Sequence, residues 1–190
     1  MLSKKILKKI PIIKRVYPSI MKIFYKNKKI RFKFFGLNLN GNFSEPMDKE
    51  IFLFNNYENL QIKFLIDNIK KFNSNYFIDI GANSGIYSLI IRDKFHKIKI
   101  KSFEPVKKTL IKFKNNLRLN KELKNIKIYK FGLSNKASKL LMRAKIRDGY
   151  IQSSGYGVAK KKDNLKDLHI ETHNFKVGDD IIKLKNKNIS

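Results

Sequence analysis

An acid followed by a glycine-rich turn is the pattern in this chain that can do chemistry. Asp79 lies in the apolar run Tyr76–Ile80, and the turn after it is Gly81, Ala82, Asn83, Ser84 and Gly85. A strand, a tight turn and a helix in this order place backbone N–H groups at the carboxyl end of the strand, where they can bind an anionic ligand. A buried carboxylate is costly unless it has a donor, so Asp79 needs turn amides or a ligand ammonium.

The two glycines of this turn have different expected roles. Gly81 allows a backbone conformation that a Cβ atom would penalise, and it lets a ligand approach the chain closely. Gly85 is expected to let the start of the helix lie close to the strand. An ordinary strand–turn–helix without a ligand would carry similar glycines, so the turn alone does not establish a site.

A second acid strengthens the pattern. Glu104 ends the next predicted strand, Ile98–Phe103, and Pro105 stops that strand. In a βαβ unit, an acid at the end of the second strand faces the same ligand as the first turn, where it can accept both hydroxyls of a ribose. The turn and the acid together predict a site for a nucleoside-containing cofactor.

The spacing of the turn indicates which cofactor. A dinucleotide-binding turn follows G-x-G-x-x-G, whereas Asn83 stands where the second glycine would clear a pyrophosphate, and the third glycine is absent. An NAD-dependent oxidoreductase is therefore disfavoured. The carboxylate and ammonium of S-adenosylmethionine suit turn amides and Asp79, so the predicted cofactor-binding residues are Asp79, Gly81, Ala82, Asn83, Gly85 and Glu104.

These motifs resemble those of the FkbM family of S-adenosylmethionine-dependent methyltransferases. The resemblance covers roughly residues 57 to 135 and rests on Phe77–Leu89, Ser102–Pro105, Asn116–Asn120 and Leu133-Ser134. It implies an α/β, Rossmann-like class I methyltransferase fold with a doubly wound sheet, and methyl transfer to a sugar or other small-molecule or glycan hydroxyl acceptor. It also implies a Tyr-Glu pair at Tyr57-Glu58, which a simple acid at a helix start would explain equally well.

The family's fourth-strand segment, of the Lys-Ile-Asp-x-Glu-Gly kind, has no counterpart in this sequence. The sheet is therefore expected to be incomplete at the C-terminus, and no catalytic residue is assigned. The first strand, Tyr76–Ile80, would then be an exposed sheet edge, which is a liability for solubility.

Composition sets further limits. The 190 residues include no Cys, which fits a reducing, cytoplasmic compartment, and 43 Lys and Arg against 15 Asp and Glu give a formal charge of +28. Because the lysines are scattered and accompany many Asn and Ile residues, the charge is interpreted as compositional bias, and a nucleic-acid partner is not expected. A basic RNA- or membrane-surface-binding module with a vestigial cofactor fold stays as the alternative.

Residues 1–45 are predicted to form a basic extension, and residues 46–190 a partial S-adenosylmethionine-binding domain. Basic and apolar residues fall at helical spacing before Pro11, so this segment either contacts an anionic membrane, packs on the domain as a terminal helix, or is a loose tail. Pro11 and Pro18 are expected to break it into short pieces. A hairpin is predicted over Ile30–Phe34 and Leu37–Leu39, with a boundary turn at Ser44–Asp48.

The spacing of apolar residues along the chain predicts the remaining helices and strands. Apolar residues predict one helix from Ile62 to Ile69 and another after Pro105, with strands at Ile126–Tyr129 and Leu168–Val177. His169 and His173 lack a third ligand nearby, so no metal site is expected. Asp179 or Asp180 is predicted to cap a short helix starting at Ile181.

Overall fold

A parallel three-stranded sheet forms the centre of the molecule. The computed structural model describes residues 11–160 and 165–182, so the segment before Pro11 lies outside the described residues. The sheet contains β3 (Tyr76–Ile80), β4 (Lys99–Phe103) and β5 (Ile126–Tyr129) in the order β3-β4-β5. The predicted first and third strands are confirmed residue for residue. The βαβαβ connection of these strands makes the fold an α/β, Rossmann-like one.

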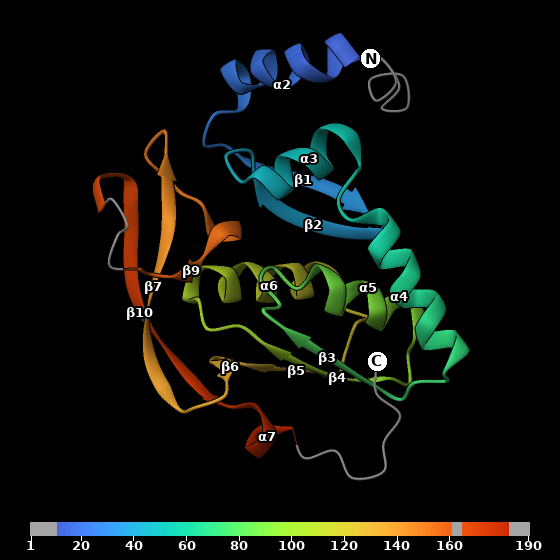
Figure 1. The fold of residues 1–190 in the computed structure, drawn as a ribbon. Coiled ribbons are helices and arrows are strands. Elements are labelled where there is room, and N and C mark those ends of the chain that lie inside the picture. Colours follow the sequence, from blue (N-terminus) through green and yellow to red (C-terminus); the bar gives the residue numbers. More distant parts are fainter. Residues whose placement is uncertain (1–10, 161–164, 183–190) are drawn as a thin grey trace.

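Three helices cover one face of this sheet (Figure 1). They are α4 (Asn59–Lys71), α5 (Ile86–Lys94) and α6 (Lys107–Leu119). Phe77 and Ile100 are register partners on β3 and β4, and both are buried against Ile69 of α4 and Ile91 of α5. The apolar stripe predicted from Ile62 to Ile69 is therefore confirmed, and it holds α4 against the sheet.

The outer edge of β3 carries no strand among the described residues. β3 pairs with β4 in parallel on one side, and Ile80 at its end is 61% exposed. Its backbone groups on the other side thus form an edge of the described sheet. A fourth strand supplied by further sequence stays a prediction.

The first described helix, α2 (Pro11–Tyr25), is continuous through Pro18. The prediction that Pro11 and Pro18 break this segment into short pieces is wrong. Proline at the start of a helix costs little, because the first N–H groups have no partner in any case. An internal proline costs about 3 kcal/mol. Here the packing of the inner face offsets that cost, since Ile13, Tyr17, Met21 and Tyr25 contact the core.

The predicted hairpin is present as β1 (Lys29–Phe34) and β2 (Leu37–Asn42), and α3 (Pro46–Phe54) follows it. The Ser44–Asp48 segment, predicted as a turn, leads directly into this helix because Pro46 suits a first helical position. Asn116 of α6 and Asn120, directly after this helix, are both buried and hold the edge of β2. The N–H of Asn40 donates to Oδ1 of Asn116 at 2.8 Å, and that of Asn38 donates to Oδ1 of Asn120 at 3.0 Å.

The hairpin shares its core with the α/β part of the chain. Phe34 and Leu39 of the hairpin belong to the same buried cluster as Ile62 of α4, Leu89 of α5 and Phe113 of α6. The hairpin therefore lies across the helices on the side away from the sheet (Figure 1).

A second, mostly antiparallel sheet follows β5. Its strands are β6 (Gly132–Ser134), β7 (Ser138–Arg147), β8 (Tyr150–Ile151), β9 (Gly157–Val158) and β10 (Leu168–Val177), with 3-10 turns at Ser153–Gly155 and Leu165–Asp167. The strand predicted over residues 168–177 is confirmed. The helix predicted from Ile181 is not, because α7 (Gly178–Ile181) begins earlier and contains Asp179 and Asp180 in its first turn. Among the described helices, none combines the length and apolarity that crossing a bilayer requires.

Candidate cofactor site

The turn after β3 adopts the conformation that its glycines were predicted to allow. Gly81 has a φ of 78°, and no atom lies within 4 Å of the position that a Cβ atom would occupy. The space beside this residue is open to a ligand, whereas any L side chain there would be strained. The end of β4 holds the backbone of the turn, because the N–H groups of Gly81 and Ala82 donate to the carbonyl of Phe103 at 2.9 and 3.0 Å.

Glu104 is built into the same turn. The N–H of Asn83 donates to its Oε2 at 2.8 Å, the N–H of Val106 donates to its Oε1 at 2.8 Å, and the residue is only 5% exposed. Asn83 has a φ of 49°, which aims its amide at the acid. Each carboxylate oxygen keeps a second lone pair for a hydroxyl. The carboxylate is thus fixed before any ligand arrives.

These contacts change the expected use of the turn amides. The N–H groups of Gly81, Ala82 and Asn83 were predicted to meet a ligand anion or Asp79, but they bond within the protein. The cause is the short reach between the ends of adjacent parallel strands, which brings the carbonyl of Phe103 and the side chain of Glu104 under the turn. The amides therefore organise the acid that a ligand would meet.

Asp79 receives its donor from α5. The hydroxyl of Ser88 donates to Oδ2 of Asp79 at 2.6 Å and lies 2.7 Å from the hydroxyl of Ser102. Asp79 and Ser102 are register partners, so both point to the face that α5 covers. Burial raises the pKa of Asp79 to about 6, the bond to Ser88 opposes this, and the charge of Glu104 adds to it. At neutral pH a carboxyl with this pKa is mostly charged, so it could bind a cationic ligand group.

Gly85 has a different role from the predicted one. A Cβ atom at this position would lie 2.1 Å from the ring of Phe113, so the glycine makes room for α6, and not for a close approach of helix and strand. Its φ of 79° also favours glycine. Gly85 lines neither cavity beside the turn, and it supports the site through packing.

Two cavities flank the turn. One, of about 250 Å³, is lined by Glu104 and by apolar side chains that include Val106, Leu133 and Phe175. The other, of about 540 Å³, is lined by Asp79, Tyr57, Glu58 and Tyr87 among others. Ile80, Gly81 and Asn83 line both. A ligand with an apolar, hydroxyl-bearing half and a charged half could lie across Gly81 and enter both cavities.

The Tyr57-Glu58 pair belongs to the second cavity. The phenol of Tyr87 donates to Oε2 of Glu58 at 2.7 Å, and Glu58 has a φ of 46° just before α4. Burial, followed by the charge of Glu58, raises the pKa of Tyr57 to about 12. Burial, followed by the bond to Glu58, also raises the pKa of Tyr87, so both phenols stay protonated and can donate hydrogen bonds. Tyr87, Ser88 and Ser102 were not predicted as site residues, although Tyr87 and Ser88 stand directly on the first turn of the helix after Gly85.

The second sheet adds a cluster of polar side chains beside the smaller cavity. Tyr156 lines this cavity, and its ring lies edge-on to His173 with 6.0 Å between the ring centres. Nε2 of His173 is 3.3 Å from Oε1 of Glu171, and Nε2 of His169 is 3.8 Å from the same atom. Within residues 11–160 and 165–182, His, Cys, Asp and Glu side chains form no group of three or more that could hold a metal ion.

Part of the chain is similar to known methyltransferases. No family model matches the chain. It is 37% identical over 65 residues to methyltransferase sdnD of Sordaria araneosa, a match that covers 34% of this chain and 25% of that protein. Among solved structures, a SAM-dependent methyltransferase from Agrobacterium tumefaciens is similar with a TM-score of 0.42 and 13% identity, over 54% of this chain and 32% of that one. The chain thus matches about a quarter of the length of its curated relative.

Proposed function

We propose that this chain binds S-adenosylmethionine at the turn between β3 and α5 and belongs to a methyltransferase that acts on a hydroxyl acceptor. The observation that carries the proposal is the carboxylate of Glu104, which two backbone N–H groups fix at the end of β4 beside the open face of Gly81. The similarity to a methyltransferase supports the reaction class. The finer assignment to the FkbM family rests on the resemblance of the sequence motifs.

The residues around the turn suit the parts of this cofactor. Glu104 would accept the hydroxyls of the ribose, and the apolar lining that includes Val106, Leu133 and Phe175 would hold the adenine ring. Asp79, with Tyr57 and Tyr87 nearby, would bind the amino-acid end of the cofactor. When bound, the cofactor would supply an electrophilic methyl group on a sulfonium.

The protein's contribution to such a transfer is mainly positioning. Holding an acceptor oxygen in line with the methyl group can supply up to about 7–11 kcal/mol. An alcohol acceptor can also require a base to remove its proton. A sugar or other small-molecule or glycan hydroxyl is the acceptor class that the sequence resemblance implies.

Calorimetric titration tests the proposal directly. We expect saturable, one-to-one binding of S-adenosylmethionine and of its demethylated product, and no binding of NAD at the same concentrations. Transfer of a labelled methyl group to a panel of sugars and other alcohols would then identify the acceptor. Binding of NAD alone, or failure of S-adenosylmethionine to bind a folded protein, would exclude the proposed cofactor.

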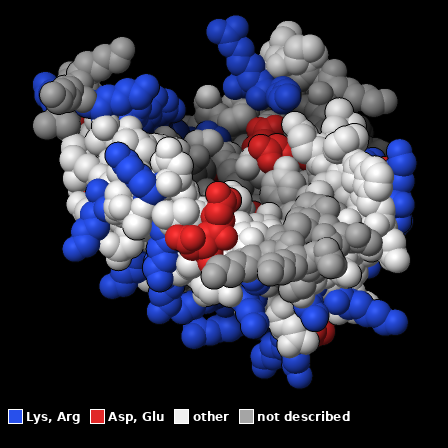
Figure 2. Space-filling view, turned by 60° about the horizontal axis from the view of Figure 1, so that its bottom comes forward, with Lys and Arg blue, Asp and Glu red and all other residues white. Residues whose placement is uncertain are grey.

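The alternative of a basic RNA-binding or membrane-binding module with a vestigial cofactor fold is not favoured. The turn after β3, the carboxylate of Glu104 and the two flanking cavities form an intact arrangement. The sequence of the chain is also similar to that of a methyltransferase. Figure 2 shows Lys and Arg spread around the visible face, with the acidic side chains near its middle, so the positive charge does not gather into one patch there. Any RNA binding is expected to be weak, without sequence preference, and lost as salt rises.

A further inference from the structure

The helix α2 exposes several large apolar side chains. Ile12 and Ile23 are 74% and 79% exposed, Phe24 is 61% exposed, and Val16 and Ile20 are 47% and 48% exposed. Isolated exposed apolar residues are common on protein surfaces, whereas a group on one short helix indicates a surface that binds something.

The spacing of these residues makes them a stripe. At about 100° per residue, Ile12, Val16, Ile20 and Ile23 project within an arc of about 80°. We call these four residues the outer stripe. The adjoining side of the helix, centred about 120° away, is already used, because Ile13, Tyr17, Met21 and Tyr25 contact the core. The apolar residues of the helix therefore occupy two adjoining sides, and the described fold covers one of them.

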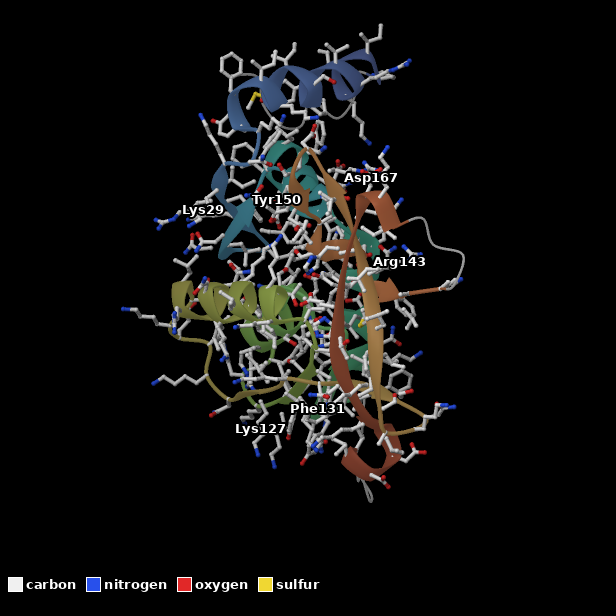
Figure 3. All side chains as sticks on the ribbon, turned by 90° about the vertical axis from the view of Figure 1, so that its left-hand side faces the viewer. Lys29, Lys127, Phe131, Arg143, Tyr150 and Asp167 are labelled. Carbon is white, nitrogen blue, oxygen red and sulfur yellow. The ribbon has the colours of Figure 1, made fainter. Side chains whose placement is uncertain are left out.

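Positive charge accompanies the outer stripe. Arg15 and Lys26 are exposed and lie beside the stripe on the helix surface, and no Asp or Glu occurs in the sequence before Glu45. Lys26 lies 3.8 Å from Asp148, so Arg15 is the stronger attraction for an anionic surface. Lys22 forms an ion pair with Asp148 at 2.6 Å, which helps to fix how the helix is rotated on the molecule. In Figure 3, side chains of α2 project away from the rest of the protein, while Lys29 and Tyr150 lie below the helix.

We infer that α2 lies in the plane of an anionic lipid bilayer, with the outer stripe in the boundary between headgroups and acyl chains. Amphipathic helices that bind in this way combine an apolar face with Lys and Arg that attract anionic lipids. A nucleic acid would use the charge but not four aliphatic side chains. A neutral protein surface would use the apolar residues but not the basic flank. This inference does not depend on the cofactor that the turn binds.

Vesicle co-sedimentation tests the outer stripe against a matched control. Vesicles of phosphatidylglycerol and phosphatidylcholine would be mixed with the full chain, with an Ile12→Gln/Ile23→Gln variant, and with Leu60→Gln. Leu60 on α4 is 79% exposed, as Ile23 is, but it lies outside α2. At 0.15 M salt we expect the double variant to bind at least about tenfold more weakly and Leu60→Gln to bind like the unchanged protein.

A second readout is necessary because the net charge of +28 could hold the protein on anionic vesicles without insertion of the outer stripe. The sequence contains no Trp, so Ile23→Trp and Leu60→Trp each introduce a single fluorescent reporter. With anionic vesicles, the emission of the Ile23→Trp protein should shift to the blue, and a quencher placed on the acyl chains should reduce it. The emission of the Leu60→Trp protein should not change.

Three results would overturn the inference. One is equal vesicle binding by the unchanged protein and the Ile12→Gln/Ile23→Gln variant. Another is equal binding to anionic vesicles and to pure phosphatidylcholine, since the basic flank would then have no role. The last is a dimer in sedimentation without lipid that Ile23→Gln dissociates, which would assign the outer stripe to a second copy of the chain.

Discussion

The backbone N–H of Asn83 and the carboxylate of Glu104 lie 2.8 Å apart, although 20 residues separate them in the sequence. This bond joins the turn after β3 to the end of β4. It means that the acid predicted to bind a ribose also maintains the turn that the cofactor would cross. A substitution of Glu104 therefore affects both stability and binding, and the two effects have to be measured separately.

Glu104→Ala is expected to weaken S-adenosylmethionine binding at least about tenfold, because hydrogen bonds to a charged acceptor contribute roughly 1.5–3 kcal/mol each. It should also lower the free energy of unfolding by about 1–3 kcal/mol, since the amides of Asn83 and Val106 lose their acceptor. Calorimetry and urea unfolding would measure the two effects. The exposed acid Glu122 supplies the control, and unchanged affinity in folded Glu104→Ala would remove this residue from the site.

Gly81→Ala should reduce cofactor affinity by at least about tenfold while costing only about 1–2 kcal/mol of stability, because the added methyl group enters open space at a strained φ of 78°. Gly36→Ala is the matched control. Gly36 has a φ of 89°, also with no atom near a Cβ, but it lies in the β1–β2 turn. Both variants should lose similar stability, and a similar affinity for the cofactor in both would contradict the prediction.

Gly85→Ala is expected to cost more stability, about 2–4 kcal/mol, because its Cβ atom would lie 2.1 Å from the ring of Phe113. The double variant Gly85→Ala/Phe113→Leu tests the cause, since a smaller side chain on α6 relieves the clash. Denaturant unfolding should show that the two substitutions together cost less than the sum of the single effects. Simple additivity would show that the ring is not what Gly85 accommodates.

Asp79 gives the stability of the protein a distinctive dependence on pH. Burial raises its pKa in the folded state from 3.8 to about 6, so the folded state binds the proton more tightly than the unfolded chain does. The contribution of Asp79 to stability is therefore most favourable below pH 3.8, is lost as pH rises towards 6, and stays low above. Asp79→Asn should be about as stable as the unchanged protein at pH 4 and about 2–3 kcal/mol more stable at pH 7.

Urea unfolding of both proteins from pH 4 to pH 7 would measure this difference in the free energy of unfolding. The other titrating groups are the same in both proteins, so their contributions cancel in the difference. A difference that does not vary with pH would show that Asp79 keeps its ordinary pKa in the folded state. If Asp79 contacts the cofactor, the more stable variant should also bind S-adenosylmethionine more weakly at pH 7.

Asn116→Ala is expected to destabilise the protein by about 2–4 kcal/mol, because the N–H of Asn40 and the carbonyl of Ser84 both lose a buried partner. The neighbouring Asn115→Ala should change stability by less than about 0.5 kcal/mol, since the side chain of Asn115 accepts only from Arg118 at the surface. Thermal unfolding of the two variants would compare them. Equal melting temperatures would mean that the asparagine contacts do not hold the hairpin.

The α/β core could be predicted from the sequence because its strands are short apolar runs that end in turn residues. Tyr76–Ile80 and Ile126–Tyr129 were located by this signal. The strand β7 was not predicted, although Leu140, Met142, Ala144 and Ile146 alternate along it, because the Lys and Arg residues between them look like the rest of this lysine-rich chain. The continuous α2 was missed because a local rule about proline could not include the packing of its inner face.

For the candidate site, the sequence pointed to the acids Asp79 and Glu104 and to the open Gly81, and their binding of a cofactor stays a prediction. The sequence could not show that Gly85 accommodates Phe113, that Ser88 donates to Asp79, or that Tyr87 bonds Glu58. Each of these contacts is set by how a helix lies on the sheet, and the register of β3 with β4 decides which side chains meet.

The asparagine contacts between β2 and α6 also constrain the order of events while the chain is being made. Asn38 and Asn40 find their partners at Asn120 and Asn116, which follow 82 and 76 residues later. Synthesis proceeds from the N-terminus, so the hairpin leaves the ribosome with these edge amides bonded only to water. The β2 edge can close only after α6 has emerged and folded, and until then a cell must keep a basic, strand-forming segment from pairing with other nascent chains.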